Sequence, residues 1–249
     1  YETPLLHRGI HIINYIEIIE LFYLFIFIIF ILFFRVVEQV KVVERDKLIL
    51  REVERWRVCG SRHIRFLAGF SGQRATDRRL KILIEAEYLE RRKYLYGIPS
   101  IYFVTSKGKK LIQSNARLEK VKIEQIVHDM TVLDSAIYFM QKENLSLQDI
   151  TTEKQLHQSD GFGIRKHRPD FIFTKNDETT CVEVEMTQKS KTRLFNIIKD
   201  NFMDYDNQIW IVPESQSVIY RILKDNQKFY TNIQIIPLKE ITDYFNQIK

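Results

Sequence analysis

Three acidic residues in the second half of the chain have the spacing of a catalytic or metal-binding site. Asp170 lies in one short apolar run, and Glu183 and Glu185 alternate with valines in the next. Asn176 and Asp177 between the two runs are typical turn residues, so the pattern predicts a β-hairpin. Because side chains alternate along a strand, we expect Glu183 and Glu185 to project together beside Asp170 while the valines pack inward.

Three carboxylates that converge in this way repel one another unless a cation neutralises them. Hard oxygen ligands of this kind suit Mg²⁺ or Mn²⁺, and we expect Asp170, Glu183 and Glu185 to bind one of these ions. Lys189 or Lys191, just past the second strand, could offset the charge of a phosphate or position a water. The alternative is a pair of solvent-exposed strands, on which acids often alternate without any function.

The elements that must hold these acids follow from the periodicity of the apolar residues. An amphipathic helix is predicted before the hairpin and another directly after it, followed by a short strand, a further helix, a last strand and a terminal helix. Strands and helices in this order indicate an α/β domain over residues 119–249. The predicted ranges, up to the terminal helix, are 124–141, 190–203, 208–212, 215–224 and 233–236.

A second pattern, over residues 46–118, predicts a winged helix-turn-helix. Asp46 can cap a first helix, and Ser61 can cap a short second helix that ends at Gly69. A turn then leads into a basic helix, and the short helix, the turn and the basic helix together make a helix-turn-helix. Two extended runs joined at Gly97-Ile98-Pro99 predict a β-hairpin, which would be the wing.

The basic helix and the wing are predicted to bind double-stranded DNA. Contacts from lysine and arginine to phosphate would dominate the affinity and make it depend on salt, while side chains near the start of the helix could reach base edges. The alternatives are a solvated basic face and a winged helix that binds protein. The expected DNA-binding residues are Arg74, Thr76, Arg78, Arg79, Lys81, Arg91, Arg92 and Lys93.

These segments, in this order, resemble the replication-relaxation family of plasmids and mobile elements. The resemblance covers about residues 46–225, and beyond the winged helix it rests on His128 to Asp134, Thr152-Glu153, Arg168-Pro169-Asp170 and Glu183 to Lys189. It implies an α+β chain in which a winged helix is followed by a restriction-endonuclease-like α/β domain. It also implies binding to an origin-like site, nicking of DNA with Mg²⁺ or Mn²⁺, and mobilisation or secretion-channel proteins as partners.

The hairpin is similar to the PD-(D/E)xK nuclease pattern, with one departure. Pro169-Asp170 and Glu183 match the pattern, but Glu185 stands where the pattern has a lysine. Lys189 is the residue that could replace that lysine. Catalysis by this set of residues therefore depends on Lys189 taking over the role of that lysine.

The nuclease pattern also implies a further acid before the hairpin. Glu153 is the first candidate, and His128 and Asp134 are others. Two functions stay open at this point. One is a metal-dependent relaxase or endonuclease, and the other is a non-catalytic DNA-binding protein, for plasmid replication, mobilisation or transcription control, on an inactive nuclease-like scaffold. The candidate catalytic residues are Asp170, Glu183, Glu185, Lys189 and Glu153.

Residues 1–45 are the compositional outlier. Apolar residues are consecutive from Leu21 to Phe34 and dominate back to Ile10, which is a borderline length for a helix that spans a bilayer. Basic residues follow the run, so a real span would place the rest of the chain in the cytoplasm. We expect a cytoplasmic protein, tethered to the membrane by residues 10–34 if the run spans and acting then as an adaptor for a secretion channel. A buried helix and a non-native extension are the alternatives.

The composition excludes several other classes of protein. With 45% hydrophobic and 28% charged residues, the chain is neither disordered nor collagen-like. The formal net charge of +6 fits a polyanionic partner. Cys59 and Cys181 lie far apart and belong to no Cys/His cluster, which argues against a structural zinc site and a disulfide scaffold.

Overall fold

The computed structural model describes residues 19–20, 22–27, 41–94, 96–97, 99–116, 122–160, 163 and 166–247. The chain divides into two units, residues 1–41 and 42–249. Residues 19–20 and 22–27 are helical, but most of the apolar helix predicted over residues 10–34 lies outside the described residues. Within the part of the chain that the structure describes, no helix is both long enough and apolar enough to cross a membrane.

The N-terminal half of the second unit, residues 42–116, contains the predicted short helix, turn and basic helix. Gly69, with a φ of 61°, closes the turn after the short helix, as only a residue without a side chain does readily. The hairpin that follows pairs Leu89 with Val104 and Arg92 with Ile101. The elements are α2 (Glu44–Arg55), β1 (Cys59–Gly60), α3 (Ser61–Leu67), α4 (Gln73–Glu85), β2 (Leu89–Arg92), β3 (Ile101–Val104) and α5 (Ser106–Leu111).

The C-terminal half, residues 122–247, is the α/β part. Its predicted hairpin is present, and Asn176 and Asp177 have the positive φ values of 52° and 65° that a tight two-residue turn requires. One helix, Glu153–Ser159, was not predicted. The elements are η1 (Ile123–Gln125), α6 (Ile126–Lys142), β4 (Ile150–Thr152), α7 (Glu153–Ser159), β5 (Phe171–Lys175), β6 (Glu178–Val184), α8 (Lys191–Asp204), β7 (Asn207–Val212), α9 (Ser217–Asn226), β8 (Ile233–Pro237) and α10 (Leu238–Gln247).

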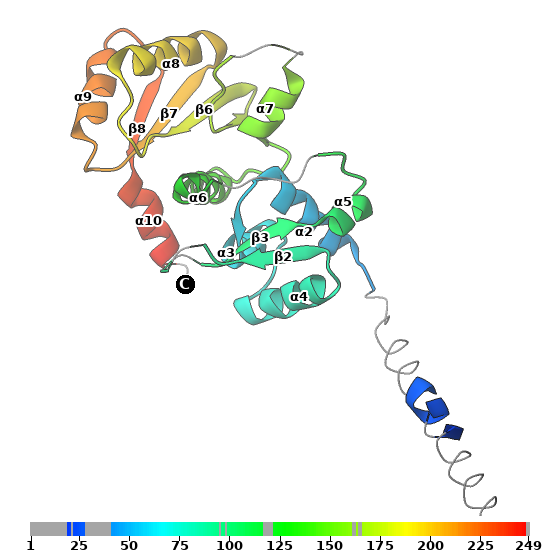
Figure 1. Cartoon of the computed structure of the whole chain (residues 1–249). Helices are drawn as coiled ribbons and strands as arrows, with labels where there is room; N and C mark the ends of the chain where they lie inside the picture. Colours follow the sequence, from blue (N-terminus) through cyan, green and yellow to red (C-terminus); the bar gives the residue numbers. More distant parts are fainter. Residues whose placement is uncertain are drawn as a thin grey trace, which may run out of the picture. The chain divides into compact units, whose positions relative to one another are not determined.

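These elements make a mixed α+β structure with two sheets among the described residues (Figure 1). The smaller sheet has the strand order β1–β3–β2 and is antiparallel. The larger sheet has the order β4–β5–β6–β7–β8. Its first three strands are antiparallel, whereas β6, β7 and β8 are parallel and are connected by α8 and α9.

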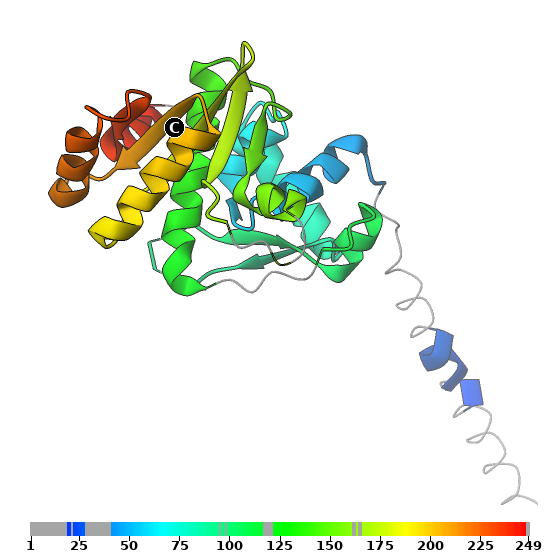
Figure 2. The ribbon, with the colours of Figure 1, turned by 90° about the horizontal axis from the view of Figure 1, so that it is seen from above.

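Helices cover both faces of the larger sheet (Figure 1). On one face, α8 and α9 pack against β7 and β8, with Ile198, Trp210 and Leu223 fully buried. On the other face lie α6 and α10, and their core continues without a break into α2, α3 and α4 of the N-terminal half. The start of α6 also packs on β3 of the smaller sheet (Figure 2). A single core therefore crosses the boundary predicted at residues 118–119.

Candidate active site

The predicted acids meet at one end of the larger sheet. The strand pairing aligns the start of β5 with the end of β4 on one side and with β6 on the other. Asp170 directly precedes β5, and the same register places it between Glu153 and Glu183. The Glu153 N–H donates to the Asp170 carbonyl oxygen at 2.9 Å. Acids from three separate segments of the sequence are thus brought side by side.

Asp170 is held by one backbone donor and one histidine. Its Oδ2 accepts from the Val184 N–H at 2.7 Å, and its Oδ1 lies 3.7 Å from His128 Nε2. Burial and the negative charge of Glu183 raise the pKa of Asp170. Burial opposes a charge on His128, but the hydrogen bond with Asp129 and the charges of Asp170 and Asp129 outweigh it and raise the pKa of His128.

Glu183 is 2% exposed and is held by two donors. His167 Nε2 lies 2.7 Å from its Oε1, and Asn201 Nδ2 donates to the same oxygen at 3.0 Å. Burial lowers the pKa of His167, but the hydrogen bond and the charge of Glu183 outweigh burial and raise it. His167 and Glu183 therefore form an ion pair that is largely shielded from water.

Glu185 and Lys189 form a second ion pair, and both follow the end of β6. Lys189 Nζ contacts Glu185 Oε1 directly. Burial raises the pKa of Glu185, although the charge of Lys189 works in the opposite direction. The expectation that only the valine side of this strand packs inward is wrong, because Glu185 is 2% exposed. β6 is a central strand with helices over both faces, so acids on either face are buried.

The backbone of Glu153 lies beside the cluster, but its side chain pairs with residues outside the cluster. Its Oε2 lies 3.0 Å from Arg57 Nη1, and its Oε1 lies 3.6 Å from His157 Nε2. Its charge still contributes to the raised pKa of Asp170. Glu153 therefore borders the cluster and has a cationic partner from the N-terminal half.

Of the two other candidates, the structure brings one into the cluster. His128 contacts Asp170, as described above. Asp134 lies on the same helix but binds Arg62 and accepts from His63 Nε2 at 2.9 Å, away from the acids. Lys191 is exposed at the start of α8.

His167 and Asn201 were missed by the sequence analysis. Asn201 had a detectable signal, because it follows Leu194, Ile197 and Ile198 on the buried side of α8. A polar residue in such a series is buried and must find a partner. His167 lies outside any strand or helix, so no periodicity indicates where its side chain points.

The cluster has the oxygen donors of a metal site, but its acids are already paired with basic side chains. Its oxygen donors have the chemistry that Mg²⁺ or Mn²⁺ prefers. Each acid nevertheless has a basic neighbour, Asp170 with His128, Glu183 with His167 and Glu185 with Lys189. The described residues include no group of three Asp, Glu, His or Cys side chains placed to hold an ion. Metal binding would therefore require at least one basic side chain to move away.

The chain matches no family model, no curated protein and no solved structure. The likeness to the replication-relaxation family thus rests on the motifs alone.

A candidate DNA-binding surface lies in the N-terminal half. Arg74, Arg78 and Lys81 are exposed on α4, and Arg91 is exposed on β2. Lys81 and Arg91 line one hollow of about 710 Å³ between α4 and the β2–β3 hairpin, together with acidic Asp77 and Glu85. The helix and the hairpin therefore present basic side chains toward the same space.

Two residues expected on this surface have other roles. Thr76 is fully buried, and its hydroxyl donates to the Gly72 carbonyl at 3.0 Å, so the prediction that it contacts DNA is wrong. Arg79 binds the fully buried Asp46, with Nε donating to Oδ1 at 2.6 Å, and ties α4 to α2. Asp46 lies in the first turn of α2 rather than before it.

The basic residues of the hairpin differ in whether an acid neutralises their charge. Arg92 and Lys93 are both exposed. Arg92 is paired with Glu90, its Nε lying 2.6 Å from Oε1, which reduces its net charge toward a phosphate. Lys93 Nζ lies 5.9 Å from the centre of the Tyr96 ring. Lys81 is likewise paired with Glu85 at 3.6 Å, so Arg74, Arg78, Arg91 and Lys93 are the exposed basic residues of this surface that form no ion pair with a described acid.

Proposed function

We propose that this chain binds double-stranded DNA through a winged helix-turn-helix made by α3, α4 and the β2–β3 hairpin, and nicks that DNA at the acid cluster of a restriction-endonuclease-like α/β half. The observation that carries the proposal is the alignment of Glu153, Asp170 and Glu183 at one end of the larger sheet. Buried ionisable groups with shifted pKa values gather preferentially at functional sites.

The order of the elements supports the nuclease-like assignment. From α6 to β7 the order is a helix, three antiparallel strands with the short helix α7 inserted between the first two, a helix and a parallel strand. This order is compatible with the fold that the resemblance implies. In it, Asp170 and Glu183 stand on adjacent strands, as the Pro-Asp and glutamate motifs require.

The roles of the residues follow from their contacts. Asp170, Glu183 and Glu185 are the residues that would hold Mg²⁺ or Mn²⁺, and such an ion would neutralise phosphate charge and activate a water. His167 and Asn201 fix the Glu183 carboxylate, and the Val184 N–H fixes that of Asp170. Lys189, which is paired with Glu185, would supply a positive charge beside a phosphate once that pair opens. Opening of the ion pairs would accompany entry of DNA and metal.

One observation favours a second candidate function. Because each buried acid already has a basic neighbour, the cluster is electrically compensated without any ion. A nuclease-like half of this kind could serve only as a scaffold. The second candidate is therefore a non-catalytic DNA-binding protein of plasmid replication or mobilisation.

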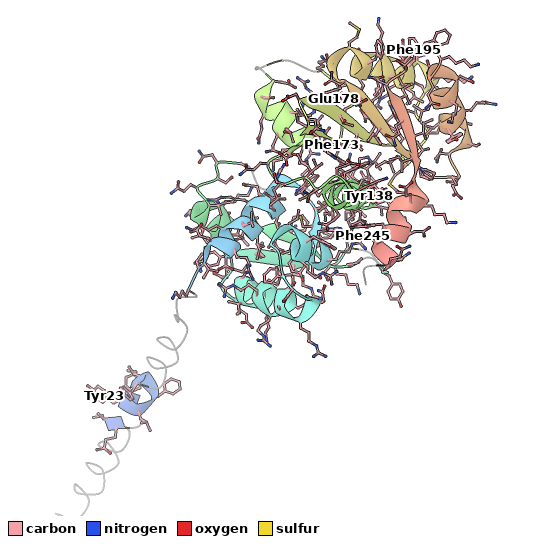
Figure 3. All side chains as sticks on the ribbon, turned by 180° about the vertical axis from the view of Figure 1, so that it is seen from behind. Tyr23, Tyr138, Phe173, Glu178, Phe195 and Phe245 are labelled. Atoms are coloured by element: carbon pink, nitrogen blue, oxygen red, sulfur yellow. The ribbon has the colours of Figure 1, made fainter. Side chains whose placement is uncertain are left out.

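Nicking of supercoiled plasmid DNA distinguishes the two candidates. The chain would be incubated with the plasmid and Mn²⁺, Mg²⁺ or EDTA, and the open-circular form measured. Nicking is expected with a metal and is expected to fall about 100-fold or more in Asp170→Asn and Glu183→Gln. Glu178→Gln is the matched control, since Glu178 is an exposed acid on the same strand (Figure 3). Salt-sensitive binding without nicking under any metal would establish the second candidate.

A further inference from the structure

A hollow of about 670 Å³ opens next to the acid cluster, between α7, the segment that precedes β5 and one side of α8. His167 forms part of its wall, and the same side chain binds Glu183 at 2.7 Å. The side chain of His167 therefore separates the hollow from Glu183 of the cluster. Neither the motifs nor the proposed chemistry assigns it a ligand.

The lining of the hollow is polar and carries more positive than negative side chains. The described lining residues include the acidic Asp200 and the basic or imidazole side chains of His157, Lys166, His167 and Arg193. Lys166 is paired with Asp204. Arg193 is exposed and forms no ion pair with any described residue.

The chemistry of this lining suits a phosphate better than a base. The described lining residues include no Phe, Tyr or Trp, and aromatic side chains are the usual platform for stacking bases. Lysine, arginine and small hydroxyl side chains are the usual partners of phosphate oxygens, and Ser190 and Thr192 also line the hollow.

We infer that this hollow binds the phosphate backbone of the DNA strand that enters the acid cluster. The inference rests on the proposed function and names a contact that the motifs do not contain. Its physical basis is electrostatic, because the exposed Arg193 adds beside the compensated acid cluster a positive charge that no described acid pairs with. Arg193, without an ion-pair partner among the described residues, is the main contact.

The test compares two substitutions on one helix. Arg193→Gln and Lys199→Gln each remove one exposed positive charge from α8, but only Arg193 lines the hollow. Binding of a fluorescein-labelled 30-base-pair duplex and of the matching single strand would be measured by anisotropy between 50 and 300 mM salt. Arg193→Gln is expected to reduce the slope of log K against log salt by about 0.9 for the duplex or about 0.7 for the single strand. Lys199→Gln is expected to keep the parent slope.

Equal slopes for Arg193→Gln and the parent chain would overturn the inference, and so would an equal loss of slope in both variants. Titration with inorganic phosphate, followed through the imidazole signals of His167, separates a strand contact from a site for small anions. Signals that shift with inorganic phosphate, combined with an unchanged DNA slope, would assign the hollow to a small anion and overturn the strand contact.

All binding measurements are made in EDTA, which makes them independent of nicking. A chain that shows the slope change but never nicks would refute only the proposed chemistry. A chain that nicks but shows no slope change would refute only the contact at the hollow.

Discussion

At the scale of single residues, the acid cluster depends on side chains from outside the hairpin, with His128 on α6, Asn201 on α8 and His167 in the segment before β5. A carboxylate that is 2% exposed is costly to charge unless donors or cations hold it. For Glu183 these are His167 and Asn201. The neighbours of the acids therefore decide whether the cluster can stay charged in the folded state.

Replacement of Asn201 by Ala tests this dependence. The substitution removes one donor from buried Glu183, and we expect the free energy of unfolding to fall by about 1–3 kcal/mol. Asn196→Ala, at an exposed position of the same helix, is expected to change it by less than about 0.5 kcal/mol. Urea unfolding measures both. Equal stability of the two variants would mean that Asn201 does not support Glu183.

His63 gives a prediction for the dependence of stability on pH. It is fully buried, its Nδ1 accepts from the Gly60 N–H at 3.0 Å, and its Nε2 lies 2.9 Å from Asp134 Oδ1. Burial lowers the pKa of His63, although Asp134 partly opposes this. The unfolded chain therefore takes up a proton near pH 6.5 before the folded chain does, and stability is lost as the pH falls below that value.

The matching measurement compares the parent chain with His63→Asn, whose side chain does not titrate. Between pH 7.5 and 5.5, the free energy of unfolding is expected to fall more in the parent chain than in the variant. The raised pKa values of His128 and His167 act in the opposite direction, but they are common to both proteins and cancel in the difference. The same pH dependence in both proteins would contradict a neutral, buried His63.

The acids themselves could be predicted because strand alternation and turn residues are local signals. Their burial could not be predicted, because it depends on α8 covering the face of the sheet that strand alternation assigned to solvent. The pairing of Glu153 with Arg57 could not be predicted either, because the two residues are far apart in the sequence.

At the scale of elements, α4 shows how one helix divides its arginines between two tasks. Arg78 is exposed, whereas Arg79 is held by fully buried Asp46 of α2. The basic character of the helix was evident from the sequence. Which of its arginines face solvent could not be predicted, because the buried acid that orients Arg79 lies on another helix.

The neighbouring arginines provide a matched pair. Arg79→Ala leaves Asp46 buried without its main cation, and we expect a loss of about 3 kcal/mol in the free energy of unfolding. Arg78→Ala is expected to leave stability unchanged and to lower the salt slope of DNA binding by about 1. Urea unfolding and anisotropy measure the two effects. A reversed pattern would mean that Arg79, rather than Arg78, faces the DNA.

α7 was missed although the sequence carries a signal for it. Gln155 N–H donates to the Thr152 hydroxyl at 3.4 Å, and the Gln155 side chain accepts from the Thr152 N–H at 3.0 Å. This reciprocal pair is a capping box, which begins a helix three residues before the glutamine. The run that follows is polar, so helical periodicity gave no support.

At the scale of the whole described unit from residue 42 onward, the two halves are joined by side chains from the end of α2. Arg55 donates to the Leu147 carbonyl at 3.0 Å and to Gln155 Oε1 at 2.8 Å, and Lys154 donates to the Glu54 carbonyl at 2.8 Å. Together with the shared core, these contacts fix the basic surface relative to the acid cluster. For the proposed function, a nick would then fall at a constant distance from the bound site.

The two tryptophans report on this coupling separately, because Trp56 lies in the N-terminal half and Trp210 in the larger sheet. The variants Trp56→Phe and Trp210→Phe each retain one of them. In each variant we expect the urea transition followed by tryptophan fluorescence to coincide with that followed by circular dichroism, as a single cooperative unit requires. Transitions that separate would show that the halves unfold independently, and the orientation between DNA-binding surface and acid cluster would then be adjustable. In that case nicks would scatter around the bound site instead of falling at one position, because nothing would hold the acids at a set distance from α4.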